Sequence, residues 1–272
     1  MIPARFDYAR PESVDEAVGL LGPGARVLAG GHSLIPALKL RQTTATTLVD
    51  VGRLAALRSV GLDGDVLVVG SGVTYAELAA DPLVRRHCPV LARLGGRVAD
   101  PQVRHRGTLA GALAHADPAG DAPAIALALG AELVVRSSAG SRVVPVDALF
   151  TGRRATSLRP GDLVTAVRVP PHGPAWYEKF TRVSHMWAIV GACVVHGPAG
   201  VRVSLANVAA TPWRATGVEE ALRAGASVTD AAGLAGDGTD PPDDVHGPAD
   251  YRRHLAQVVT RRALERATGG AA

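Results

Sequence analysis

The chain has 272 residues, of which 47% are hydrophobic and 20% are charged, a balance typical of a globular protein with a sizeable core. Its net charge is +4 and its pI is near 9.5, but the arginines are scattered and aromatic residues make up only 4%, which argues against nucleic-acid binding. No segment has the apolar length of a membrane span and the N-terminus lacks a secretory signal core, so we expect a cytoplasmic protein without membrane insertion.

The N-terminal part of the chain predicts a βαβ-like unit. A capping box at residues 13–16 opens a helix, a short buried strand covers residues 27–29, and another strand covers residues 47–51. Between the strands, the pair Gly30–Gly31 breaks the chain and Ser33 stands where it can cap a short helix. The unit therefore brings a glycine turn to the end of a strand.

The glycine pair at residues 30–31 has two interpretations. Because glycine has no Cβ atom, successive backbone N–H groups can approach one ligand, and such a nest before a helix start binds phosphate. The plainer interpretation is a tight strand-to-helix turn with an ordinary serine cap. Short glycine motifs occur by chance, so this segment alone favours the plain turn.

The rest of the chain mixes hairpins, helices and one clear linker, the Pro-Pro-His-Gly-Pro segment at residues 170–174. Before the linker we expect a hairpin over 59–73 with Asp63–Gly64 at its turn, followed by a capping box at 74–77. A helix is expected over 88–98, interrupted near Gly95–Gly96, and another over 122–129, capped by Asp121. A hairpin of 132–138 and 141–147 and a strand over 163–170 complete this part. After it we expect strands over 175–183, 188–196 and 201–209, helices over 218–225 and 249–267, and a loop over 237–248.

A second glycine-bearing segment, residues 107–121, follows the first at a distance in the chain. Two such turns can close on one extended phosphate-containing ligand, although neither matches the G-x-G-x-x-G fingerprint or the G-K-[ST] of a P-loop. Asp121 is placed either to accept a hydrogen bond from a ribose hydroxyl or to cap the next helix. The cysteines Cys88 and Cys193 and the scattered histidines do not have the spacing of a metal site, so no metal is expected.

Five motifs together resemble a known family. They are LAGGHSLIPALKLR at 28–41, ADPQVRHRGTLAG at 99–111, ADPAGD at 116–121, YEKF at 177–180 and GPADYRRHLAQVVTRRALERA at 247–267. In this order they resemble the FAD-binding (medium) subunit of molybdenum hydroxylases, the family of the carbon monoxide dehydrogenase medium chain and the xanthine dehydrogenase flavin domain. The resemblance covers essentially the whole chain.

The resemblance implies an α+β fold. Residues 1–54 and 55–170 would form the two subdomains of an FAD-binding fold of the vanillyl-alcohol-oxidase (PCMH) type, and residues 174–272 a C-terminal α+β domain with a three-stranded antiparallel sheet and helices. It also implies an FAD-dependent oxidoreductase subunit that transfers electrons, and two partners: a molybdenum-cofactor large subunit and a [2Fe–2S] small subunit. No catalytic base or nucleophile is expected, because the redox chemistry belongs to the cofactor.

Family positions that contact FAD carry over onto this sequence one by one. The pyrophosphate would be wrapped by Val27, Leu28, Ala29, Gly30, Gly31, His32, Ser33 and Leu34, with Gly30, Gly31 and Ser33 central. The second cradle would be Gly107, Thr108, Gly111 and Ala112, followed by Gly120 and by Asp121, which would hold the adenosine ribose. The isoalloxazine or its linker would lie near Val98 and Ala99, with Leu163 lining the flavin pocket and with Lys179 and Trp187 approaching the ring.

Lys179 and Trp187 each have a second interpretation. Only Lys39 and Lys179 are lysines among the 29 basic residues, and a cation at the ring favours anionic reduced flavin, which is why we assign Lys179 to the cofactor. The alternative is an ion pair with Glu178 or another acid. Trp187 stands where carbon monoxide dehydrogenase relatives have a tyrosine over the ring, and the alternative is an ordinary core tryptophan.

The second cradle departs from the family pattern, which reads T-I-G-G-N or T-I-G-G-S. Ala110 adds a Cβ atom where the backbone is expected to press on the cofactor, and Ala112 removes a polar side chain. A lost hydrogen bond to a charged group costs about 1.5–3 kcal/mol, so we expect FAD to bind less tightly rather than not at all. Two alternatives stay open: a stand-alone flavin oxidoreductase that acts on an organic substrate, and a degenerate, non-catalytic member.

Overall fold

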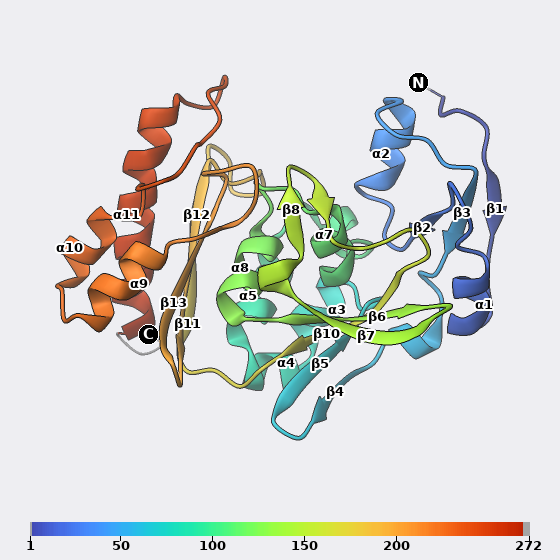
Figure 1. Ribbon diagram of the computed structural model, residues 1–272, viewed down its shortest axis with the longest axis horizontal. Helices are drawn as coiled ribbons and strands as arrows, with labels where there is room; N and C mark the ends of the chain where they lie inside the picture. The colour runs from blue at the N-terminus through green and yellow to red at the C-terminus, as the bar shows by residue number, and fades with distance from the viewer. Residues whose placement is uncertain (1, 269–272) are drawn as a thin grey trace.

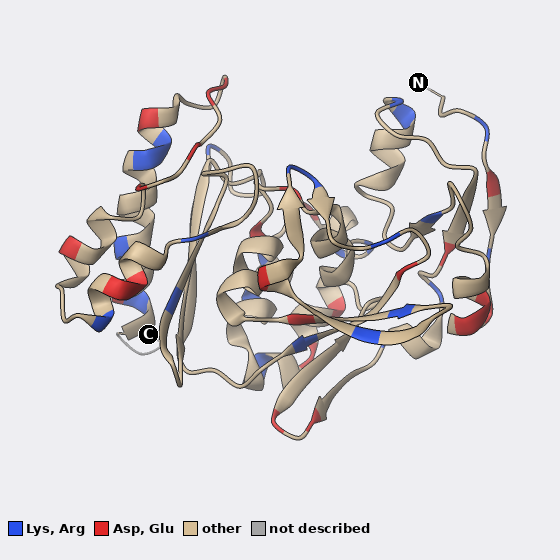
Figure 2. Cartoon of the chain, viewed as in Figure 1, with Lys and Arg blue, Asp and Glu red and all other residues tan. Residues whose placement is uncertain are grey.

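The computed structural model describes residues 2–268, so Met1 and residues 269–272, the last four of the expected C-terminal domain, lie outside the described part. Figure 1 shows three parts along the long axis: a small sheet near the N-terminus, a larger sheet with helices in the centre, and a third sheet covered by helices at the opposite end. Figure 2 shows basic and acidic residues interspersed over all three parts. Within residues 2–268 no helix is both long and apolar enough to cross a membrane.

The first part is the predicted βαβ-like unit. Its three strands pair in parallel in the order β1-β3-β2. The elements are β1 (Asp7–Ala9), α1 (Val14–Gly19), β2 (Arg26–Leu28), α2 (Leu34–Lys39) and β3 (Thr47–Asp50). Parallel pairing places the carboxyl ends of all three strands at one edge of the sheet, and the first glycine segment follows β2 at that edge.

The central part is a five-stranded antiparallel sheet in the order β4-β5-β10-β6-β7. Its strands are β4 (Val60–Asp63), β5 (Val66–Gly70), β6 (Glu132–Ser137), β7 (Gly140–Pro145) and β10 (Leu163–Val169). Both predicted hairpins are confirmed, with the first turn at Gly64–Asp65, one residue later than expected. The short elements η1 (Ala55–Leu57), η2 (Val146–Ala148), β8 (Phe150–Gly152) and β9 (Ala155–Thr156) were not expected from the sequence.

Six helices accompany this sheet: α3 (Tyr75–Ala80), α4 (Pro82–His87), α5 (Pro89–Arg97), α6 (Pro101–Arg104), α7 (Leu109–His115) and α8 (Asp121–Leu129). The predicted interruption near Gly95–Gly96 is wrong, because α5 runs through both glycines. A Cβ atom on Gly95 would lie 2.5 Å from the backbone oxygen of Tyr75, so this glycine lets α5 pack closely on α3.

Of the two predicted capping boxes, one is complete and the other is formed in part. Thr74 and Glu77 form the predicted reciprocal capping box at the start of α3. Ser13 caps α1 by accepting from the Glu16 backbone N–H, but the Glu16 carboxylate accepts from the Glu12 N–H at 2.7 Å instead of the Ser13 N–H. The helix therefore starts where expected, but the Glu16 carboxylate binds the N–H of Glu12, one residue before the expected Ser13.

The C-terminal part is a sheet in the order β11-β12-β13-β14, antiparallel throughout. Its strands are β11 (Ala175–Phe180), β12 (Val190–Gly197), β13 (Gly200–Ala206) and β14 (Trp213–Arg214). The three expected strands are confirmed, and the two-residue β14 adds a short fourth. The helices are α9 (Thr216–Arg223), α10 (Val228–Gly233), which was not expected, and α11 (Ala249–Thr268), which packs on β11 and β12.

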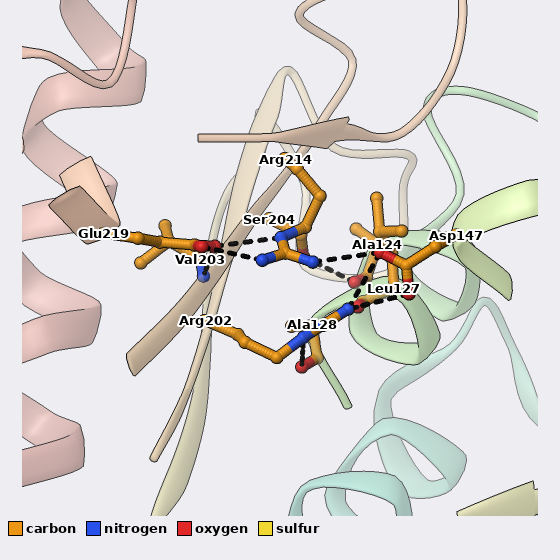
Figure 3. Close-up of polar contacts among 9 residues, drawn as sticks. All are labelled: Ala124, Leu127, Ala128, Asp147, Arg202, Val203, Ser204, Arg214 and Glu219. Atoms are coloured by element: carbon orange, nitrogen blue, oxygen red, sulfur yellow. Dashed lines mark hydrogen bonds and ion pairs between the residues drawn. The ribbon is translucent and has the colours of Figure 1, made fainter. Parts of the chain in front are cut away.

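A polar network joins this C-terminal sheet to the central part (Figure 3). Arg202 of β13 donates to the backbone oxygens of Leu127 and Ala128 at 2.8 and 3.0 Å, at the end of α8. Asp147 accepts from both Arg202 and Arg214. The network therefore links β13 and β14 to the helix and the 3-10 turn that precede them in the chain.

Glu219 supports this network from the other side. Its carboxylate accepts from both Nε and Nη2 of Arg214, at 2.9 and 2.6 Å, and from the Val203 backbone N–H at 2.7 Å. Only 6% of Glu219 is exposed. A buried carboxylate with three donors holds β13, β14 and α9 in one arrangement.

We predict that Glu219→Ala lowers the free energy of unfolding by about 1–3 kcal/mol, because it leaves the Val203 N–H without its acceptor and the Arg214 guanidinium with Asp147 as its remaining acid. Urea unfolding followed by circular dichroism measures the change. Glu220→Ala is the matched control, since Glu220 is the next residue of α9 and is exposed. Equal stability of the two variants would contradict the assigned role of Glu219.

Candidate functional site

After β2 the first glycine segment forms a turn whose backbone conformation favours glycine. Gly31 has φ +79°, in the left-handed region, and its backbone oxygen accepts from the Ile35 N–H at 2.9 Å. Ser33 holds the predicted N-cap position of α2, but its side chain makes no capping hydrogen bond. The Ser33 hydroxyl therefore does not cap the N-terminus of α2.

The two glycine segments predicted to act together meet backbone to backbone. A Cβ atom on Gly30 would lie 2.2 Å from the Arg106 oxygen and 2.8 Å from the Gly107 Cα atom. No side chain larger than hydrogen fits this contact without moving the backbone. Gly30 therefore joins the N-terminal part to the loop before α7.

The second segment is fixed by its own local bonds. Thr108 caps α7 by accepting from the Gly111 N–H at 3.0 Å, and the Gly107 oxygen accepts from the Tyr75 N–H at 2.9 Å. Ala110 is only 4% exposed and packs in the central hydrophobic core, with Ala112 partly buried against the same core. The expectation that the Ala110 methyl crowds the cradle is therefore wrong, because this methyl faces the protein interior.

A cavity of about 480 Å³ lies between α5, the loop after it, and β11. Three of the predicted residues line it, namely Ala99, Asp121 and Lys179, together with Arg93, Arg97, Arg104 and Tyr177. Lys179 Nζ donates to Asp121 Oδ2 at 2.7 Å, and their side chains are only 15% and 10% exposed. Three arginines and one largely buried Lys179–Asp121 ion pair thus surround one hollow.

The position of Asp121 corrects one expectation and bears on a second. Asp121 is the first residue of α8 and Gly120 stands at the N-cap, so the predicted aspartate cap is wrong. The sequence interpretation also placed Asp121 at the ribose and Lys179 at the flavin ring, which are remote parts of FAD. The structure brings the two side chains into direct contact, and both line the same cavity.

Two functional residues escaped the sequence analysis. Arg104 donates to the backbone oxygens of Val98 and Ala99 at 3.1 and 2.6 Å and so holds this loop, in which Ala99 has φ +44°. Tyr177 lines the cavity beside Lys179. The alternation of side chains along a strand was the available signal, because residues two apart share a face.

Trp187 and Leu163 do not line this cavity. Trp187 is 60% exposed and lies at a second hollow of about 240 Å³, which Arg182 and Arg252 also line. The interpretation of Trp187 as a core residue is therefore wrong. Leu163 is buried in a hydrophobic cluster against which Val27 and Ala29 pack, beneath the first glycine segment. It is placed near the cradle rather than in the cavity of Lys179.

Comparison with known proteins identifies the family. A family model described as the FAD binding domain in molybdopterin dehydrogenase matches residues 4–172, and one described as the CO dehydrogenase flavoprotein C-terminal domain matches residues 175–267. The chain belongs to the molybdopterin dehydrogenase FAD-binding family. The resemblance inferred from the motifs and the expected fold class are thereby confirmed.

Individual relatives of this family match over the whole chain. The carbon monoxide dehydrogenase medium chain of Hydrogenophaga pseudoflava is 38% identical, with 98% of each chain covered. The 6-hydroxypseudooxynicotine dehydrogenase complex subunit alpha of Paenarthrobacter nicotinovorans is 32% identical, covering 98% of this chain and 96% of its own. The solved structure of carbon monoxide dehydrogenase from Hydrogenophaga pseudoflava superposes with a TM-score of 0.95, at 39% identity and full coverage of both chains.

The residues present fit the FAD of this family. Gly30 and the left-handed Gly31 carry no side chain of their own that could block their backbone N–H groups, and Ala110 packs in the core. The neighbouring cavity offers a buried ammonium in an ion pair. Among residues 2–268, no group of three or more His, Cys, Asp or Glu side chains is placed to hold a metal ion.

We predict that Gly30→Ala lowers the free energy of unfolding by about 1–3 kcal/mol, because the new methyl forces the Arg106 carbonyl away. Thermal unfolding monitored by circular dichroism tests this. Gly22→Ala is the control, since a Cβ atom at Gly22 meets nothing within 4 Å. A Gly30→Ala protein as stable as the control would show that the two glycine segments do not touch in solution.

Proposed function

We propose that this protein is the FAD-binding medium subunit of a molybdenum hydroxylase-type complex. It takes electrons from an iron–sulfur partner and passes them to an acceptor such as NAD, a quinone or O₂. The observation that carries this proposal is the backbone contact of Gly30 with Arg106 and Gly107, which brings the two glycine segments together in a chain that also holds the cavity of the Lys179–Asp121 pair. Membership in the FAD-binding family agrees with it.

The FAD pyrophosphate would lie against the two glycine segments, whose backbone N–H groups supply donors for its negative charge. The first segment contributes Val27, Leu28, Ala29, Gly30, Gly31, His32, Ser33 and Leu34, and the second contributes Gly107, Thr108, Gly111 and Ala112. The isoalloxazine would occupy the 480 Å³ cavity beside Val98 and Ala99. We reassign Asp121 from the ribose to this ring end, because it contacts Lys179.

The residues of the chain have distinct tasks in this scheme. FAD, when bound, supplies a ring that takes up electrons in one reaction and releases them in the next. The Lys179 ammonium places positive charge in a half-enclosed site, where charge interactions are stronger than in water. Asp121 holds this ammonium, and Arg104 holds the backbone at residues 98–99.

The same proposal covers the wider setting of the protein. Its partners are a molybdenum-cofactor large subunit and a [2Fe–2S] small subunit, the complex is cytoplasmic, and substrate selection lies with the molybdenum subunit. Residues 1–54 and 55–170 serve as the two FAD-binding subdomains and residues 174–272 as the C-terminal domain. Relatives named for carbon monoxide and for 6-hydroxypseudooxynicotine agree with a medium chain that does not determine the substrate.

Two other functions make different predictions. A stand-alone flavin oxidoreductase needs no partner chains, whereas a degenerate member binds no flavin. The burial of the Ala110 methyl in the core removes one of the two arguments for degeneration, and only the missing polar side chain at Ala112 remains.

We predict that the purified chain retains FAD, visible as flavin absorption bands after desalting, and that Ala112→Asn tightens binding about tenfold by restoring a donor. An absorbance titration with FAD measures both. Ala114→Asn is the matched control, because Ala114 is an exposed residue of the same helix. A colourless wild-type chain that takes up no FAD would favour the degenerate alternative.

The complex is tested separately from the cofactor. Expression of the tagged chain in its native host, followed by affinity purification, should yield two further chains that carry molybdenum and iron. Metal analysis of the purified material measures these. A chain that retains FAD but purifies alone and free of both metals would favour the stand-alone oxidoreductase.

A further inference from the structure

Lys179 shares its carboxylate with a neighbour on the same strand. Tyr177 and Lys179 lie two residues apart on β11, so both side chains point to the face that packs on the central part. The Tyr177 hydroxyl donates to Asp121 Oδ1 at 2.7 Å, and Lys179 Nζ donates to Asp121 Oδ2 at 2.7 Å. One carboxylate thus receives one donor on each oxygen.

The Tyr177 hydroxyl is suited to act only as a donor. Burial and the charge of Asp121 raise the pKa of Tyr177 well above its ordinary value, so the phenol stays protonated. A hydrogen bond to a charged acceptor is stronger than one between neutral groups and restricts the direction of the carboxylate. Tyr177 therefore restrains Asp121 without competing for the lysine.

The neighbouring strand provides the room for this hydroxyl. Gly191 of β12 pairs with Lys179, and a Cβ atom on Gly191 would lie 2.2 Å from Tyr177 Oη and 2.8 Å from Tyr177 Cζ. Gly191 does not have a positive φ angle, so its backbone conformation does not demand glycine. Glycine is required at this position because the Tyr177 side chain occupies the space that a Cβ atom would need.

We propose that Tyr177 is a positioning residue of the cofactor cavity: its hydroxyl fixes Asp121 so that the Lys179 ammonium is held at the cavity wall, and Gly191 provides the space. The statement about the cofactor rests on the proposed function. The statement about Lys179 concerns the chain alone. The two parts can therefore be tested separately.

The first test needs no flavin, because the chain has only two lysines. Trace labelling with acetic anhydride, read by mass spectrometry, compares Lys179 with the exposed Lys39 in the same molecule. The Lys179:Lys39 labelling ratio should rise about tenfold in Tyr177→Phe, because the released Asp121 no longer restrains the ammonium. Asp121→Asn is the reference for full loss of the pair and should raise the ratio at least as far.

Tyr8→Phe is the matched control for the labelling. Tyr8 donates to Asp50 at 2.6 Å in the first sheet, so the variant loses the same kind of bond elsewhere, and its ratio should equal that of the wild type. Gly191→Ala should raise the ratio as Tyr177→Phe does, because its methyl displaces the hydroxyl. An unchanged ratio in Tyr177→Phe overturns the proposal, as does an unchanged ratio in Asp121→Asn.

The second test concerns the cofactor. FAD titration and a reductive titration of the bound flavin should show about tenfold weaker binding and a lower midpoint potential in Tyr177→Phe, and no change in Tyr8→Phe. A changed labelling ratio with unchanged FAD binding and potential overturns the cofactor part. If the wild-type chain binds no FAD, the proposed function fails, whereas the labelling ratio still decides whether Tyr177 positions Lys179.

Discussion

Burial of the short helix α8 between two sheets is the constraint on which both the site and the domain contact depend. Residues 122–129 are all buried, so this helix has no solvent face and its two ends are its polar features. Asp121 stands at the N-terminal end, where the helix dipole favours a negative charge, and Arg202 binds the carbonyl groups at the other end, where it favours a positive one. The helix therefore sets Asp121 opposite β11 at one end and anchors β13 at the other.

Backbone contacts form two parts of the candidate site, the glycine segments and the loop at residues 98–99. Gly30 approaches Arg106 more closely than any side chain allows, and the loop at residues 98–99 is held through its carbonyl groups by Arg104. Ala110 stands where the family pattern has glycine, and it packs in the central core. When backbone N–H groups form a binding site, a neighbouring side chain obstructs the ligand only if it points toward the site.

Features set by local physics were predictable from the sequence. Turn residues and apolar runs indicated the hairpins of the central sheet and the three long strands of the C-terminal sheet, and the spacing of Thr74 and Glu77 indicated the capping box. Features set by contacts between remote segments were not predictable. Gly95 serves close packing of two helices, and the carboxylate of Asp121 meets donors from β11 rather than its own helix. The motifs identified the ligand, whereas the partners of each side chain required the fold.

The bonds of Arg202 to main-chain oxygens have an evolutionary consequence. Every residue type that keeps α8 helical presents the same carbonyl groups, so substitutions at positions 127 and 128 leave these two hydrogen bonds in place. The contact of Lys179 with Asp121 joins two side chains, and a change in one requires a matching change in the other. Along the buried helix that joins the domains, divergence is therefore expected to be limited by packing and not by these hydrogen bonds, whereas at the cavity it is expected in coupled steps.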